Sequence, residues 1–153
     1  MGRYWAQVDL AWLAGFIDGE GSIAINRSRG KSAHLEGSWV AHFNVGGTDK
    51  GTILWIAQHF NGTFSTTPSD NHYKDSHKCR WTYETGAELM PHVLPFLKTK
   101  RLQAQYYLEF VTECSSLKHG RCLPDGARKR AARLAAMCAA VADHQSRWKG
   151  LSL

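Results

Sequence analysis

Apolar positions near the start of the chain recur every three to four residues, which predicts a helix from Asp9, a residue suited to the N-cap, to Asp18. One apolar stripe on this helix consists of Leu10, Leu13, Ala14 and Ile17. A second side of the helix carries, at the same spacing, Trp12, Gly15, Phe16 and Gly19. A helix that is apolar on two sides is either a central core helix or one shared with a partner, and the pattern alone fits both.

Alternation of apolar and polar residues predicts two pairs of strands further along the chain. The first pair comprises residues 22–28 and 38–45, which a long basic loop connects. The second pair comprises residues 63–67 and 78–85, which a polar segment separates. The apolar face of these strands is expected to face the core, and it consists of Ile23, Ile25, Trp39, Ala41, Phe43, Val45, Trp81 and Tyr83.

Helical patterns surround the two strand pairs. The expected helices are residues 50–60, 87–97, 100–114 and about 125–149. The first of them ends at Asn61-Gly62, a typical helix C-cap, and the second contains two prolines. This order predicts an α+β fold with an antiparallel sheet, in which a core of about 9–114 precedes the last helix. The length favours a single domain over residues 1–153.

Charge and cysteine content narrow the function class. The chain has 19 Lys and Arg against 13 Asp and Glu, a formal net charge of +6. A basic balance of this size favours an acidic partner such as nucleic acid, although a charged soluble surface would also produce it. The four cysteines form no CxxC pair, and the sequence contains neither a signal-peptide pattern nor an apolar run long enough to span a membrane. We therefore expect a soluble, intracellular protein that is not secreted.

The helix ends in a distinctive motif. Leu13–Gly21 reads LAGFIDGEG and resembles the signature of the LAGLIDADG homing endonucleases, and PFLKTK at residues 95–100 resembles that family's second conserved segment. The resemblance implies an αββαββα fold with an antiparallel, saddle-shaped DNA-binding sheet and extra C-terminal helices. Because the chain carries one copy of the motif, the resemblance also implies a homodimer. The faces that pack together would then be formed by Trp12, Gly15, Phe16 and Gly19.

The acids at the helix end suggest metal chemistry. Two helix ends that meet would bring two copies of Glu20 together, and such carboxylates repel unless a cation lies between them. Mg²⁺ prefers hard oxygen ligands. The resemblance implies that Glu20 and the Gly19 carbonyl bind the metal, and that Lys100 is the basic residue near the scissile phosphate. Mg²⁺ is the expected cofactor, with Mn²⁺ able to substitute and Ca²⁺ supporting binding without cleavage. Asp18 is interpreted as a mainly structural acid.

One position departs from the family pattern. The family often has glutamine or a similar polar residue just after the second strand, where this chain has Gly46 and Gly47. Glycine has no side chain with which to orient a water molecule. Three explanations stay open: Asn44, Asp49 or Lys50 substitutes for the missing side chain, the solvent network differs, or activity is impaired.

The polar face of the strands predicts a DNA-binding surface. It mixes hydrogen-bonding side chains with small apolar groups, as the reading of base edges in a major groove requires, and basic residues of the first hairpin would contact phosphates. The expected DNA-binding residues are Ser22, Ala24, Asn26, Ser28, Arg29, Lys31, Ser38, Val40, His42, Asn44, Ser65, Thr67, Lys78, Arg80 and Thr82. The alternative is an ordinary solvated sheet face. The last helix begins with four cations that suit either a bound phosphate or a solvated surface, namely Arg128, Lys129, Arg130 and Arg133.

These features together predict a site-specific homing endonuclease. It is expected to hydrolyse both strands of a long, near-palindromic double-stranded DNA target with divalent metal and to leave short 3′ overhangs. The alternative is a protein of the same fold that does not cleave, either an RNA-splicing maturase or a DNA-binding regulator. RNA is an expected partner only under the maturase alternative, and no membrane partner is expected. A basic dimerisation module without nucleic acid also fits the helix, but it gives the polar strand face no role.

Overall fold

The computed structural model describes four stretches of the chain, which are residues 3–27, 39–70, 72–113 and 125–149. Side chains at residues 125–128 and 146–149 are not described. In chain order the elements are α1 (Gln7–Glu20), β1 (Gly21–Arg27), β2 (Trp39–Gly47), α2 (Lys50–His59), β3 (Thr63–Thr67), β4 (Ser76–Trp81), α3 (Tyr83–Val93), the 3₁₀ helix η2 (Leu94–Phe96), α4 (Arg101–Glu113) and α5 (Asp125–Lys149). This order confirms the predicted αββαββα layout with extra C-terminal helices.

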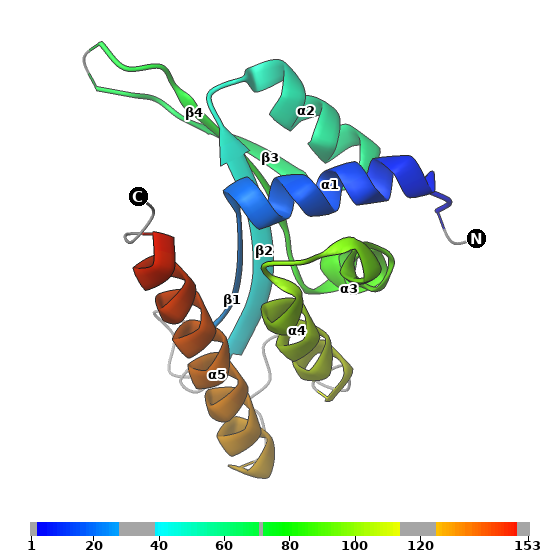
Figure 1. Cartoon of the computed structure of the whole chain (residues 1–153), viewed down its shortest axis with the longest axis vertical. Helices are drawn as coiled ribbons and strands as arrows, with labels where there is room; N and C mark the ends of the chain where they lie inside the picture. The colour runs from blue at the N-terminus through cyan, green and yellow to red at the C-terminus, as the bar shows by residue number, and fades with distance from the viewer. Residues whose placement is uncertain (1–2, 28–38, 71, 114–124, 150–153) are drawn as a thin grey trace. The chain divides into compact units, whose positions relative to one another are not determined.

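The four strands form one sheet in the order β1-β2-β4-β3 (Figure 1). Strand β4 pairs antiparallel with both β2 and β3, and it places Trp81 opposite Phe43 and Cys79 opposite both Val45 and Phe64. Phe43 and Trp81 are fully buried and stack with ring centroids 4.8 Å apart. The alternation of buried and exposed positions along the strands confirms the predicted core face, except that Trp39 is only half-buried and Tyr83 lies outside the strands.

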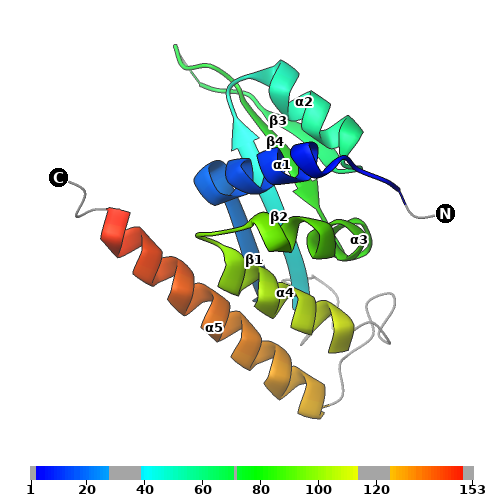
Figure 2. The same cartoon turned by 45° about the vertical axis from the view of Figure 1, so that its right-hand side comes forward.

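The chain forms two compact units. The first contains residues 1–22 and 42–101, and in it α1 lies between α2 and α3 in both views (Figures 1 and 2). The predicted apolar stripe of α1 is the side that packs inward, and its buried residues are Leu10, Leu13, Ala14 and Ile17. Among the described residues, α1 is buried on this side only, because Gly15 and Gly19 on its second side are exposed.

The second unit contains residues 23–41 and 102–153. Helix α4 contributes an apolar side to it that includes Tyr107 and Phe110. Helix α5 contributes Leu134 and Cys138, and the Cys138 thiol lies 3.4 Å from the backbone oxygen of Ile23. Within the residues that the structure describes, no helix combines the length and the apolar character needed to cross a membrane.

Several element boundaries differ from the sequence predictions: the helix predicted at residues 87–97 is α3 followed by η2, and the strand predicted from residue 78 starts at Ser76. Two further differences change an interpretation. Asp9 is not the N-cap of α1, because the helix starts at Gln7 and the Asp9 carboxylate lies 3.0 Å from the His59 ring instead. The strand predicted at residues 78–85 ends at Trp81, so Tyr83 belongs to α3 and not to the core face of the sheet. The Thr82 carbonyl accepts a helical hydrogen bond from the Gly86 amide, so α3 begins here in spite of the strand propensity of a Thr-Tyr pair.

Candidate functional site

The C-terminal end of α1 presents oxygen ligands to solvent. The amide of Gly21 donates to the Ile17 carbonyl and ends the helix, and β1 begins at the same residue. Gly19 and Glu20 are exposed just before this point. The last carbonyls of a helix have no partner within the helix, so the Glu20 carboxylate and the Gly19 carbonyl are both oxygen donors of the kind that Mg²⁺ prefers.

Lys100 is held at this same helix end. Its ammonium Nζ donates to the backbone oxygen of Asp18 over 2.6 Å, and its backbone amide donates to Asp18 Oδ1 over 2.9 Å. The other carboxylate oxygen of Asp18 accepts from the amide of Lys98 over 2.8 Å. The structure therefore brings Lys100 to the helix end that carries Glu20, and it gives Asp18 the structural role expected of it.

One chain alone offers an incomplete metal centre. Among the described residues, no group of three or more His, Cys, Asp or Glu side chains could hold a metal ion. The donors at the end of α1 are one free carboxylate, that of Glu20, and one main-chain carbonyl. This donor set fits a hard divalent cation in its chemistry, but it needs oxygen atoms from water, substrate or a second chain to complete the coordination.

The outer face of β2, β4 and β3 carries the polar surface predicted from the sequence. Asn44 lies opposite Arg80, and Ser65 lies opposite Lys78. The side chains of Lys78 and Arg80 are exposed, whereas those of His42 and Asn44 are half-buried. Ser65 and Thr67 on β3 are exposed as well, so these residues form a mixed hydrogen-bonding surface with two cations.

The remaining predicted DNA-binding residues fall into three groups. On β1, Ser22 and Asn26 are exposed and Ala24 is half-buried; on β2, Val40 is 37% exposed. Thr82 is exposed, but it lies at the start of α3 and not in a strand. The last group lies outside the described residues and consists of Ser28, Arg29, Lys31 and Ser38.

His42 has an unusual electrostatic environment on this face. Burial lowers the pKa of His42 below its ordinary value of 6.5, and the nearby charges of Arg80 and Lys78 lower it further. Its ring atom Nδ1 is buried and has no hydrogen-bond partner among the described residues. His42 is thus a neutral group with an unused hydrogen-bonding atom beside two cations.

Gly46 and Gly47 are the last two residues of β2, and they differ in the space around them. A Cβ added at Gly46 would lie a tight 3.2 Å from the His77 carbonyl oxygen, whereas one at Gly47 would meet, among the described residues, only Ile53 Cδ1 at 3.8 Å, an ordinary van der Waals contact. Asp49 cannot readily replace the missing side chain, because its carboxylate caps α2 by accepting from the Gly51 amide and the Thr52 hydroxyl, the latter over 2.6 Å. The hydrogen bond from Thr52 is also the main reason why the pKa of Asp49 is lowered.

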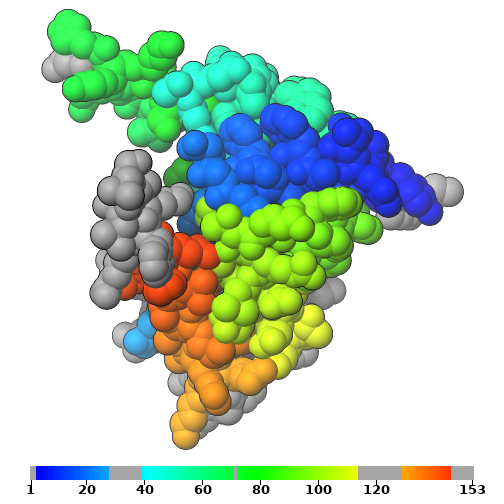
Figure 3. Space-filling view, in the orientation of Figure 1, coloured from blue at the N-terminus to red at the C-terminus, as the bar shows by residue number. Residues whose placement is uncertain are grey.

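The second side of α1 is exposed. The surface of α1 faces the viewer in Figure 3. A Cβ built on Gly15 or on Gly19 would meet no atom of the described residues of other elements within 4 Å, and Trp12 is 44% exposed. Trp12 stacks on the half-buried Phe16 with a centroid distance of 5.3 Å. It also contacts Trp55 of α2 edge to face at 5.4 Å, and Trp55 is 42% exposed.

Trp55 extends this open face beyond the residues predicted from the sequence. The prediction missed it because only the tertiary packing of α2 beside α1 brings the two tryptophans together. Val8, which is 74% exposed, was missed as well. Its spacing of four residues from Trp12 would have revealed it.

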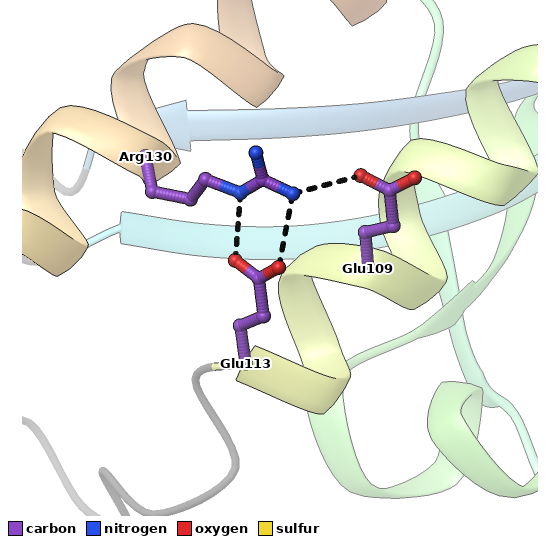
Figure 4. Close-up of polar contacts among 3 residues, drawn as sticks. All are labelled: Glu109, Glu113 and Arg130. Atoms are coloured by element: carbon purple, nitrogen blue, oxygen red, sulfur yellow. Dashed lines mark hydrogen bonds and ion pairs between the residues drawn. The ribbon is translucent and has the colours of Figure 1, made fainter.

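The cations of α5 are not all available to a phosphate. Arg130 donates from Nε and Nη2 to the two carboxylate oxygens of Glu113 over 2.8 and 3.0 Å, and from Nη2 to Glu109 over 3.5 Å (Figure 4). These carboxylates also raise the pKa of Arg130. Lys129 and Arg133 are exposed, and the side chain of Arg128 lies outside the described residues. Arg130 therefore joins α5 to α4 within the second unit.

Comparisons with known proteins agree with this geometry. A family model described as LAGLIDADG endonuclease matches residues 13–116. The structure is similar to the homing endonuclease I-CvuI solved in complex with its target in the presence of Ca, with a TM-score of 0.75, 22% identity, and coverage of 88% of this chain and 82% of the other. It is similar to the archaeal intron-encoded homing endonuclease I-Vdi141I complexed with DNA, with a TM-score of 0.71, 16% identity, and coverage of 88% and 84%.

A third similar structure is the LAGLIDADG homing endonuclease I-SmaMI bound to cleaved DNA, with a TM-score of 0.64 and 19% identity. The match covers 87% of this chain but only 43% of I-SmaMI. No curated protein matches the chain by sequence. At these levels of identity, the structural likenesses establish the fold of the chain.

Proposed function

Because the chain belongs to the LAGLIDADG endonuclease family, we propose that it is a homing endonuclease that acts as a homodimer on double-stranded DNA. It cuts both strands of a long, near-palindromic target with a divalent metal and leaves short 3′ overhangs. One observation carries this proposal. Glu20, the last residue of α1, is exposed, and the Lys100 ammonium donates a hydrogen bond to the Asp18 carbonyl at the same end of the helix. An acid that binds metal and a fixed cation beside it suit hydrolysis of a phosphodiester.

Glu20 and the Gly19 carbonyl would hold the ion, with Mg²⁺ as the cofactor and Mn²⁺ as its substitute. A divalent ion bound there supplies stabilisation of the attacking and leaving oxygens. The Lys100 ammonium would stabilise negative charge as it develops on the phosphate. I-CvuI was solved in complex with its target in the presence of Ca, which supports our expectation that Ca²⁺ allows DNA binding here.

The dimer follows from the same helix. Each chain provides a single free carboxylate at the end of α1, so two cuts and two metal-binding acids require two chains. The open face formed by Trp12, Gly15, Phe16 and Gly19 is the surface that would bring the two helix ends together, because small residues allow close approach of the backbones. The two-fold symmetry of such a dimer implies a near-palindromic target.

The sheet supplies the contacts to DNA. His42, Asn44, Lys78 and Arg80 lie on the outer face of β2 and β4, where the cations suit phosphates or guanine edges and the neutral groups suit other base edges. The formal net charge of +6 favours association with a polyanion.

The test is a selection from a randomised duplex library in Ca²⁺, followed by addition of Mg²⁺ and counting of strand breaks. We expect a long, near-palindromic winner that is cut on both strands only with Mg²⁺. Glu20→Gln should retain affinity and lose cutting, whereas Glu88→Gln, the same charge change at an exposed position of α3, should change neither. Cutting by Glu20→Gln would overturn the assignment of the metal ligand.

One observation favours the second candidate function, a protein of this fold that does not cleave. Gly47 leaves open space where a polar side chain is expected, and Asp49 is committed to capping α2. Tight and specific duplex binding without breaks in Mg²⁺ would favour a DNA-binding regulator. Failure to bind any duplex would favour binding to structured RNA, as in a maturase.

A further inference from the structure

Asp18 makes three polar contacts with one short segment that lies about eighty residues further along the chain. Its Oδ2 accepts from the Lys98 amide over 2.8 Å, and its Oδ1 accepts from the Lys100 amide over 2.9 Å. Its main-chain oxygen accepts from Lys100 Nζ over 2.6 Å. Each carboxylate oxygen of Asp18 therefore accepts a hydrogen bond from a backbone amide of this segment.

These contacts offset the electrostatic cost of the position. Acidic residues are disfavoured at the C-terminal end of a helix, which carries the negative end of the macrodipole. Helix α1 has no basic residue in its own last turn. The ammonium of Lys100 provides the missing cation, and it binds the Asp18 carbonyl, one of the terminal carbonyls that lack a partner within the helix.

The atoms that Asp18 contacts indicate that its carboxylate fixes the backbone that carries Lys100. A lysine side chain is long and flexible, and a single hydrogen bond from Nζ fixes it poorly. The Asp18 carboxylate binds the backbone of the same lysine and of the residue two positions before it, so the base of the side chain is fixed as well as its tip. Three contacts from one acid thus define where the ammonium lies.

We infer that Asp18 is a positioning residue, whose carboxylate fixes the Lys98–Lys100 backbone so that the Lys100 ammonium lies at the helix end that carries Glu20. This inference rests on the proposed endonuclease function. Asp18 then serves strand cleavage through Lys100 and contacts neither DNA nor metal. Asparagine in its place keeps the size but turns one acceptor into a donor, which must face an amide N–H.

The first experiment measures single-turnover cleavage of the selected duplex by dimeric protein in Mg²⁺, with affinity measured separately in Ca²⁺. Asp18→Asn should slow cleavage about 10- to 100-fold, because a displacement of about 1 Å at a reacting site has an effect of that size. Affinity in Ca²⁺ should stay within about twofold, since Asp18 does not contact DNA. Asp143→Asn, the same substitution on an exposed part of α5, is the matched control and should cleave normally.

A double-mutant cycle separates positioning from general structural damage. If Asp18 acts through Lys100, then adding Asp18→Asn to Lys100→Met should slow cleavage no further than Lys100→Met alone, because residues that act as a unit are not additive. Additive losses would overturn the inference, and so would wild-type cleavage by Asp18→Asn. A wild-type protein that binds the duplex but never cuts it would overturn the proposed function first, and the positioning role with it.

Amide hydrogen exchange tests the contacts without any cleavage. In Asp18→Asn, the amides of Lys98 and Lys100 should exchange at least about tenfold faster, while those of the β4 strand keep their protection. Unchanged exchange at both lysines would overturn the inference even if cleavage were slow. Faster exchange over the whole first unit would also overturn it, because it would show that the substitution unfolds the unit instead of releasing one segment.

Discussion

Replacing Gly21 with alanine should destabilise the chain by about 2 kcal/mol. A Cβ at this position would lie 2.6 Å from the Ile17 carbonyl oxygen, 2.8 Å from the Ile17 Cα and 3.1 Å from the Asn44 carbonyl oxygen, all well inside ordinary contact distance. All three are backbone atoms that cannot rotate away. The φ of −94° suits any residue, so the cost is purely steric. Because backbone atoms cannot move aside, the overpacking cost lies near the upper end of the usual range, at about 3 kcal/mol, and a reduced entropy of the unfolded chain recovers roughly 0.4–1 kcal/mol of it.

The assay is thermal and urea unfolding at fixed protein concentration, followed by circular dichroism. A loss of about 2 kcal/mol corresponds to a fall in Tm of about 4–8 °C for a chain of this length. Gly47→Ala is the control, because its Cβ would meet only Ile53 Cδ1 at 3.8 Å, and its Tm should stay within about 2 °C of the wild type. The reasoning is refuted if Gly21→Ala unfolds at the wild-type temperature, or if the two variants are destabilised equally.

Three further predictions test other parts of the molecule. Gly15→Leu should convert the proposed dimer to monomer in analytical ultracentrifugation, because a large side chain would hold the open faces of α1 apart; a stable dimer would show that another surface is used. In the wild type, the pKa of His42 is lower in the folded chain than in the unfolded chain, so below about pH 6.5 the unfolded chain binds a proton that the folded chain does not. The free energy of unfolding therefore falls as the pH falls, by at most about 1.4 kcal/mol per pH unit. His42→Gln should remove this contribution, so its free energy of unfolding in urea should fall less between pH 7.5 and pH 5.5. Gly47→Gln should speed single-turnover cleavage, because the open space there admits a side chain able to orient water; a slower variant with normal affinity would contradict this.

The periodic parts of the fold were predictable from the sequence. The spacing of apolar residues in α1 and the alternation in β1 and β2 correspond directly to buried and exposed positions, because one face of each element packs inward. The end of β4 was not predictable in this way. Thr82 and Tyr83 continue a strand-like pattern, and only the helical hydrogen bond from the Gly86 amide to the Thr82 carbonyl reveals that α3 has begun.

The candidate site was predictable in its composition but not in its connections. The motif indicated Glu20, Gly19 and Lys100 as residues, and it indicated a structural acid at Asp18. The bonds from the Lys98 and Lys100 amides to Asp18 join positions 80 and 82 residues apart, and no local pattern encodes them. Close approaches between backbones, such as the one that requires glycine at position 21, are invisible in sequence for the same reason.

Gly15 and Gly19 inside α1 carry a cost in the free energy of folding. Glycine within a helix costs roughly 0.5–1 kcal/mol relative to alanine. At Gly21 the nearby backbone of the same chain leaves no room for a side chain, but at Gly15 and Gly19 a Cβ would meet no other described element within 4 Å. Alanine would therefore be the more stable residue at both positions in a lone chain. The cost is offset only if another surface approaches α1 closely there, and the exposed Trp12 on the same side favours that conclusion. The face that carries Gly15 and Gly19 would be stabilised by a partner, and Glu20 directly follows Gly19 at the end of this face. Formation of the dimer would therefore bring the two Glu20 carboxylates together and form the metal centre in the same step.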